Sequence, residues 1–249
     1  MDDILPLIKS RRNIPEFLPK DLSWDQVSKI IDAGRHAPSS GNLQNWKFIV
    51  VRNPDKRHKV AEISMDQYEI SVAPVHIVVC AEPEKTERYY GIRGEKLYTI
   101  QNCAAAIENM LLEATSLGLG CRWIGAFHED KLKDLLSIPP EIRPQAIIAI
   151  GYPKFIPPKP PKYPLEPITY FEKWRNRVTD PDKYFGNYSA VLARNLQGAQ
   201  EGVTKAAKFV AKKAEPGAKS FADKMKDKWD EQFAKRKAKE KKRADEKIE

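Results

Sequence analysis

Two short segments, residues 75–81 (VHIVVCA) and 146–150 (AIIAI), constrain the fold most strongly. Both are almost wholly apolar and rich in β-branched residues, which favour strands over helices. Both are also far shorter than the roughly 18 residues that a membrane-spanning helix needs. A continuous apolar run of this length is typical of a strand that is buried on both faces. The sequence therefore predicts a sheet with buried strands.

Helical patterns alternate with these strand patterns. Ser23 and Gln26 form a capping box, which opens a helix that should end before Pro38. The longest helix is expected over residues 95–117, where apolar residues recur at three- and four-residue steps. Further helices are expected at residues 54–63 and 129–136, and further strands at 47–52, 121–127 and 145–150. This alternation puts the body of the chain in the α/β or α+β class.

The stretch from Pro139 to Pro167 contains ten of the 19 prolines. Proline lacks the backbone N–H that helices and central strands need. We therefore expect residues 139–167 to form an extended arm along a surface.

The positive charge of the chain is concentrated near its C-terminus. Residues 186–249 contain 17 Lys+Arg and 10 Asp+Glu, a net charge of +7, whereas residues 1–185 carry only +2. The nearly neutral body argues against a nucleic-acid-binding protein. We predict one domain over residues 1–185 and a basic, Ala/Lys-rich tail over 186–249 that is helical or partly disordered.

Within this tail, four apolar residues recur at every fourth position: Phe221, Met225, Trp229 and Phe233. Such a stripe can pack on its own protein or on a second copy of the chain. A solvated or disordered tail and contact with a membrane surface are the alternatives.

The three cysteines, Cys80, Cys103 and Cys121, show neither CxxC nor metal-ligand spacing. They are expected to be buried free thiols, which indicates a reducing compartment, and no metal site is expected. The first residues, Met1-Asp2-Asp3, are acidic, unlike a secretory signal, so we expect a cytoplasmic protein. Walker A, HExxH, GxSxG and complete dinucleotide-binding motifs are absent from the sequence.

Three stretches carry candidate chemistry. Residues 10–13 (SRRN) place two guanidinium groups where they can bind an anion such as a phosphate. Residues 37–46 (APSSGNLQNW) form a polar loop with donors and acceptors suited to a planar heteroaromatic ligand. Residues 117–125 (LGLGCRWIG) contain glycines that allow close approach of the backbone to a ligand.

In this order and at these separations, the three stretches resemble the FMN-dependent nitroreductase family. The resemblance extends through residues 102–112 (NCAAAIENMLL) and 164–166 (PLE), and it covers residues 4–172. It implies an α+β fold in which helices flank a mixed sheet. It also implies an intertwined homodimer with two FMN sites at the subunit interface.

The resemblance also implies roles for particular residues. Arg11, Arg12 and Asn13 would hold the phosphate and ribityl chain of FMN, and Lys162 would contact the phosphate. Ile124 and Gly125 would lie at the N5 and O4 edge of the flavin ring. The loop residues Pro38, Ser39 and Ser40 would contact the isoalloxazine from the other subunit. Asn42 would also lie near the ring system.

The implied activity is hydride transfer from NADH or NADPH through flavin N5 to a nitroaromatic, a quinone or a similar small acceptor, in a ping-pong mechanism. No side chain is expected to act as a catalytic acid or base. One alternative is a specialised relative, such as a reductive dehalogenase or an enzyme that fragments reduced flavin. The other is a flavin-binding or membrane-surface interaction protein that acts through its basic tail.

The sequence also departs from the family pattern. Family members commonly continue with a basic residue where this chain has Pro15, and they more often have Arg at the position of Lys162. They commonly have Asp at the position of Asn102 and Pro at the position of Asn45. A lysine is a point charge and cannot replace the two-pronged contact of an arginine, so weaker FMN binding is expected.

Overall fold

The computed structural model describes residues 4–185 and residue 204. The chain divides into two compact units, residues 1–160 and 161–249, and each unit is described by itself. The predicted tail helices and the apolar stripe at residues 221–233 lie outside the described residues. The predicted domain boundary at residues 185/186 stays a prediction.

The first unit is built on a four-stranded sheet with the order β1-β2-β4-β3. Its strands are β1 (Trp46–Val51), β2 (Val75–Ala81), β3 (Gly120–Ile124) and β4 (Arg143–Gly151). Every neighbouring pair of strands is antiparallel. Among the described residues the parallel direction occurs only in an isolated bridge between Asn13 and Cys121, which corrects the expected mixed sheet. The expected α+β class is confirmed.

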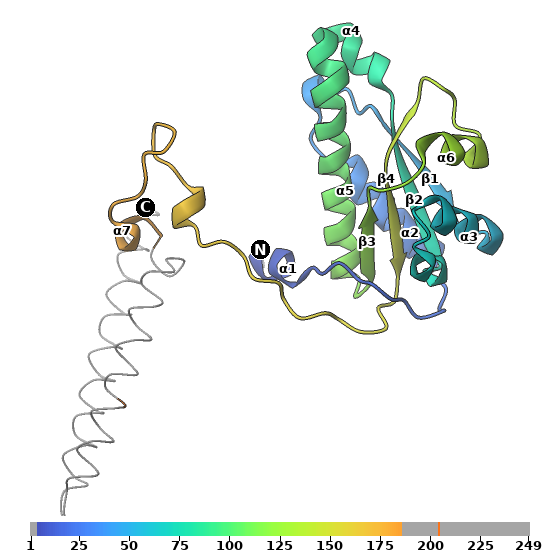
Figure 1. Ribbon diagram of the computed structural model, residues 1–249, viewed down its shortest axis with the longest axis horizontal. Coiled ribbons are helices and arrows are strands. Elements are labelled where there is room, and N and C mark those ends of the chain that lie inside the picture. The colour runs from blue at the N-terminus through green and yellow to red at the C-terminus, as the bar shows by residue number, and fades with distance from the viewer. Residues whose placement is uncertain (1–3, 186–203, 205–249) are drawn as a thin grey trace, which may run out of the picture. The chain divides into compact units, whose positions relative to one another are not determined.

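Strand β2 explains why the sheet is buried on both faces. Its odd-numbered residues pack with α2 (Trp24–Arg35) and α5 (Thr99–Ser116). Its even-numbered residues pack with α3 (Pro54–Ile63) and α6 (Glu129–Leu136). Figure 1 shows α5 along one side of the sheet and α3 and α6 on the other. Because side chains alternate along a strand, a strand between two helical layers must be apolar throughout.

The remaining elements of the first unit are shorter or less regular. Helix α1 (Leu5–Ser10) opens it, and η1 (Ser40–Asn42) and η2 (Tyr68–Val72) are single 3₁₀ turns. Helix α4 (Pro83–Arg93) runs into the π-helical turn η3 (Gly94–Tyr98), which leads into α5. The predicted helix over residues 95–117 therefore becomes regular only at Thr99. The capping box is confirmed, since the Ser23 Oγ accepts from the Gln26 backbone N–H at 3.2 Å.

Strand β4 confirms the strand predicted at residues 145–150, and it shows that the extended arm predicted for residues 139–167 was wrong for the first part of that stretch. Strand β4 lies inside this stretch and pairs on both sides, with β2 and with β3. Pro144 is tolerated because the register between β2 and β4 shifts at Val79 and Cys80, which pair with Ala146 and Pro144. A bulge at this point accommodates a residue that cannot donate to the ladder.

The second unit contains little regular structure in its described part. It includes η4 (Glu166–Ile168), an isolated bridge between Tyr170 and Arg177, and α7 (Pro181–Phe185). The Phe171 ring packs on the Tyr184 ring at a centroid distance of 4.8 Å. Within the described residues of both units, none of the helices has the length and apolar character required to cross a bilayer.

Candidate functional site

The first and third candidate stretches lie side by side. The Ile14 backbone N–H donates to the Cys121 carbonyl at 2.9 Å, and Asn13 bridges Cys121. Gly120 makes this approach possible, because a Cβ on Gly120 would lie 2.5 Å from Cγ1 of Ile14. The fold therefore brings the segment 11–14 onto the edge strand β3.

Two arginines flank this junction in different ways. Arg11 is half-buried, and within the described residues its side chain makes a long ion pair, with Nε 3.6 Å from Oε1 of Glu108. Arg12 turns back onto α1, and its Nη1 donates to the carbonyls of Lys9, Ser10 and Arg11 at 2.8–2.9 Å. The Nε of Arg12 is buried and has no hydrogen-bond partner in the described part of the chain. A buried donor without a partner destabilises the fold unless a ligand satisfies it.

The second stretch is a tight loop with unusual backbone geometry. Gly41, Asn42 and Gln44 all have positive φ, between 48° and 54°. Left-handed backbone is unfavourable for side-chain-bearing residues and is concentrated at functional sites. Pro38, which precedes this part of the loop, is exposed.

A buried amide of helix α5, Asn102, holds this loop and also bonds the buried Asn45 at the end of the loop. Oδ1 of Asn102, on α5, accepts from the Ser40 backbone N–H at 3.0 Å. Nδ2 of Asn102 donates to the Ser40 Oγ at 3.0 Å and to Oδ1 of Asn45 at 2.8 Å. The two positions noted above as departures from the family pattern, 45 and 102, are thus bonded to each other.

Helix α5 separates the loop from the two arginines. The loop is bonded at position 102 and Arg11 at position 108, which is about 9 Å farther along the helix. At about 100° per residue, the two positions lie roughly 120° apart around the helix axis. One chain therefore presents the loop and the arginines on different sides of α5.

The other predicted site residues have differing exposure. Ile124 ends β3 with its side chain buried in the core, so only its backbone could face a ligand. Gly125 is exposed, and a Cβ built on it would meet nothing within 4 Å. Lys162 is exposed and belongs to the second unit.

Arg122 makes a contact at the junction that the sequence motifs did not predict. Nη2 of Arg122, on β3, donates to Oε1 of Gln67 at 2.7 Å, and Nη1 reaches the Pro15 carbonyl at 3.4 Å. Arg122 therefore joins β3, the loop before η2 and the segment after Asn13. The signal available in the sequence was a charged residue within a predicted strand, since charged side chains are seldom placed there without a partner.

The three cysteines are buried and free, as predicted. Burial raises the pKa of each thiol to about 12, so all three are protonated and unreactive at neutral pH. The part of the chain that the structure describes contains no cluster of His, Cys, Asp and Glu that could hold a metal ion.

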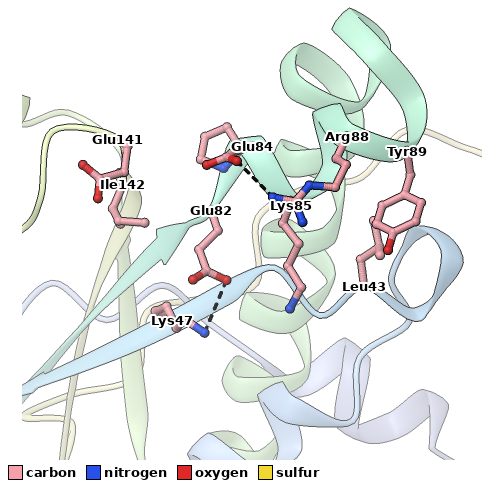
Figure 2. Close-up of a pocket in the computed structure, with 10 residues that line it drawn as sticks. Leu43, Lys47, Glu82, Glu84, Lys85, Arg88, Tyr89, Glu141 and Ile142 are labelled. Atoms are coloured by element: carbon pink, nitrogen blue, oxygen red, sulfur yellow. Dashed lines mark hydrogen bonds and ion pairs between the residues drawn. The ribbon is translucent and has the colours of Figure 1, made fainter.

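A pocket of about 520 Å³ lies outside the predicted site residues but borders the loop at Leu43 (Figure 2). Its walls carry charges of both signs. Lys47 pairs with Glu82 at 3.3 Å and Arg88 with Glu84 at 3.1 Å. Because these charges largely neutralise each other, the pocket shows no clear preference for an anion or a cation.

The family model described as "Nitroreductase family" matches residues 8–82 and 67–152, which is more than half of the chain. The chain belongs to the nitroreductase family. A protein of Archaeoglobus fulgidus whose name includes "NAD(P)H nitroreductase" is 35% identical over 158 residues, covering 62% of this chain and 87% of that protein. The FMN reductase [NAD(P)H] of Bacillus subtilis is 26% identical over 190 residues, covering 71% and 76%.

Solved nitroreductase structures agree with this assignment. A nitroreductase family protein from Clostridium novyi NT superposes with a TM-score of 0.56 and 31% identity, covering 72% of this chain and 98% of that one. The family match includes both arginines, the loop and Gly125, but it ends before Lys162. The predicted role of Lys162 therefore stays a prediction that rests on the sequence alone.

Proposed function

We propose that this nitroreductase is an FMN-dependent oxidoreductase that takes electrons from NADH or NADPH and passes them to a small acceptor such as a nitroaromatic or a quinone. The Nε of Arg12 at the junction with β3, which is buried and has no hydrogen-bond partner among the described residues, carries the proposal. The names of the relatives support it, since the similar Bacillus subtilis protein is an FMN reductase.

The residues at the junction fit a phosphate-bearing flavin. In the described part of the chain Arg11 is held by a long ion pair with Glu108, which is weak enough for its guanidinium to bind a phosphate instead. Arg12 offers its Nε, and Asn13 is exposed beside them. Gly125 leaves open space at the end of β3 for a flat ring.

Bound FMN supplies hydride acceptance at N5 and alternate transfer to a second substrate, which is ping-pong chemistry. The residues of this chain would bind the flavin and orient it. The arginines hold negative charge, and the backbone beyond Ile124 offers hydrogen-bond donors at the edge of the ring. The loop residues Ser39 and Ser40 would contact the flavin ring and exclude water from it.

Two copies of the chain complete the site in this proposal. The loop and the arginines lie on different sides of α5, so the loop of one copy would serve the flavin held by the other. Exposed apolar side chains on three helices support a partner surface. They are Ile4 at the N-cap of α1, Ile8 within α1, Tyr89 and Ile92 on α4, and Ile100 on α5.

Replacing Arg11 with alanine is expected to weaken FMN binding about tenfold or more, because a charge-assisted contact to the phosphate is lost. Flavin release followed by fluorescence measures the affinity. Arg35→Ala is the matched control, since Arg35 pairs with Asp32 on the exposed surface of α2. Equal FMN affinity in the Arg11 variant and wild type would show that the phosphate binds elsewhere.

Replacing Ile100 with glutamate is expected to raise the dimer dissociation constant about tenfold or more, because a charge would be buried between the copies. Sedimentation of the full chain measures this constant. Val72→Glu is the control, because Val72 is similarly exposed, 42% against 46%, and lies on η2, which packs with α3 on the opposite face of the sheet. A wild-type chain that sediments as a monomer would contradict the two-copy site.

The proposal as a whole is tested by the absorption spectrum of the purified chain with added FMN and by oxidation of NADH and NADPH. Protein-bound flavin and acceptor-dependent oxidation are expected. Product analysis separates generic reduction from dehalogenation or flavin fragmentation. A chain that binds no FMN and oxidises neither nucleotide would refute the proposed activity.

A further inference from the structure

The amide group of Asn102 makes three hydrogen bonds, and two of them hold one residue, Ser40. Its Oδ1 accepts from the Ser40 backbone, and its Nδ2 donates to the Ser40 hydroxyl and to Asn45. Asn102 is 5% exposed and Asn45 is fully buried. Hydrogen bonds in such a dry environment are strong when they are satisfied and costly when one partner is removed.

The loop needs an anchor of this kind. Its internal side-chain bonds run from the Gln44 N–H to the Ser39 Oγ and from Nε2 of Gln44 to Asn42. None of these bonds attaches the loop to the core. Two side-chain-bearing residues with positive φ, Asn42 and Gln44, make it a strained segment, and strained segments persist only where surrounding structure over-determines them.

We propose that Asn45 and Asn102 act as a pair of positioning residues that fixes Ser39 and Ser40 for contact with the flavin. The inference rests on the proposed function for its flavin part, but the anchoring itself is a property of this chain alone. Neither asparagine is proposed to touch the flavin.

The hydrogen-bonding capacity of an amide explains how the pair works. The Nδ2 group of Asn102 has two N–H donors. One donates to the Ser40 hydroxyl, and the other donates to Oδ1 of Asn45. Nδ2 of Asn45 has no hydrogen-bond partner within the described residues. The Asn45 amide could therefore turn over and donate Nδ2 to a carboxylate at position 102.

Asn102→Leu tests the anchor, because leucine has a similar size and can neither accept nor donate a hydrogen bond. In the full chain without flavin, hydrogen exchange of the Ser40 amide is expected to accelerate about tenfold or more. Asn109→Leu is the matched control on the same helix, since Nδ2 of Asn109 donates to the Ala33 carbonyl on α2. Ser40 exchange in this control should stay within about twofold of wild type.

Asn102→Asp is the conservative rescue. Aspartate keeps an acceptor for the Ser40 N–H, accepts from the Ser40 hydroxyl and can accept from a turned Asn45. Ser40 exchange should return to within about threefold of wild type. In FMN-loaded protein, the leucine variant should release flavin about tenfold faster or more, while the aspartate variant and the Asn109 control should not.

A double-mutant cycle with Asn45→Ala and Asn102→Ala tests the pair. The combined effect on Ser40 exchange should be smaller than the product of the two single effects, since both changes remove one shared bond. Independent effects would overturn the pairing. Ser40 exchange that is equal in Asn102→Leu and Asn109→Leu would overturn the anchor.

Different results would refute the role of the pair in flavin binding and its role in anchoring the loop. A wild-type chain that binds no FMN refutes the proposed activity and leaves the exchange test intact. Faster Ser40 exchange with unchanged flavin release, in a chain that does bind FMN, overturns the role of the pair in flavin binding.

Discussion

Replacing Gly94 with alanine is expected to lower the free energy of unfolding by about 3 kcal/mol. A Cβ on Gly94 would overlap the carbonyl oxygen and carbon of Thr86 and would lie 2.9 Å from Cβ of Tyr90. The Thr86 carbonyl belongs to the backbone of α4 and cannot rotate away as a side chain can. The variant must therefore separate α4 from η3 at a buried contact.

Urea unfolding of wild type and the Gly94→Ala variant measures the difference in free energy. Gly125→Ala is the control, because a Cβ there meets no atom within 4 Å. The control should change the free energy of unfolding by less than about 0.5 kcal/mol. Equal stability of the two variants would show that α4 and η3 separate without cost.

Acidification is expected to destabilise the fold by about 3 kcal/mol through His76 alone. Burial, aided by the positive charge of Arg57, lowers the pKa of His76 from 6.5 to about 4, although the hydrogen bond with the Ile70 carbonyl opposes this shift. As the pH falls below 6.5, His76 binds a proton in the unfolded chain but stays neutral in the folded chain until the pH approaches 4. The stability is therefore fully present above the unfolded pKa and is lost between pH 6.5 and 4.

Urea unfolding from pH 7 to pH 4 in wild type and His76→Asn checks this expectation. Other groups also titrate in this range, so the difference between the two pH profiles is the relevant quantity. Wild type should lose about 3 kcal/mol more than the variant. His58→Asn, at an exposed position that stacks on Tyr68, should follow wild type. Parallel profiles for wild type and His76→Asn would exclude His76 as the source.

Local sequence patterns predicted the elements whose cause is local. The capping box of Ser23 and Gln26 opens α2, and Asn53, whose side chain accepts from the Lys56 N–H, caps α3 just before Pro54. The apolar run at residues 75–81 predicted a strand buried on both faces. Successive side chains of a strand point to opposite faces of the sheet, so an uninterrupted apolar run indicates that both faces are covered.

Predictions that depend on pairing between distant segments were less successful. The apolar run predicted a strand at residues 145–150, but the proline count of residues 139–167 predicted an extended arm over the same segment, because a register shift opposite Val79 and Cys80, which removes the conflict at Pro144, is not visible in the sequence. The expected helix start near residue 95 failed for a similar reason, since Gly94 packs on Thr86 and the turn after it is π-helical.

For the candidate site, the sequence determined which chemical groups are present, and the tertiary structure decided how they are oriented and which partners they bond. The residues 11–13, the loop and the glycines of β3 were identifiable as motifs. Their sequence did not reveal that Arg12 turns back onto α1 or that Asn45 and Asn102 bond across 57 positions. The orientation of a side chain and the partner of a buried amide depend on contacts between segments far apart in the chain, and only the folded structure brings these segments together.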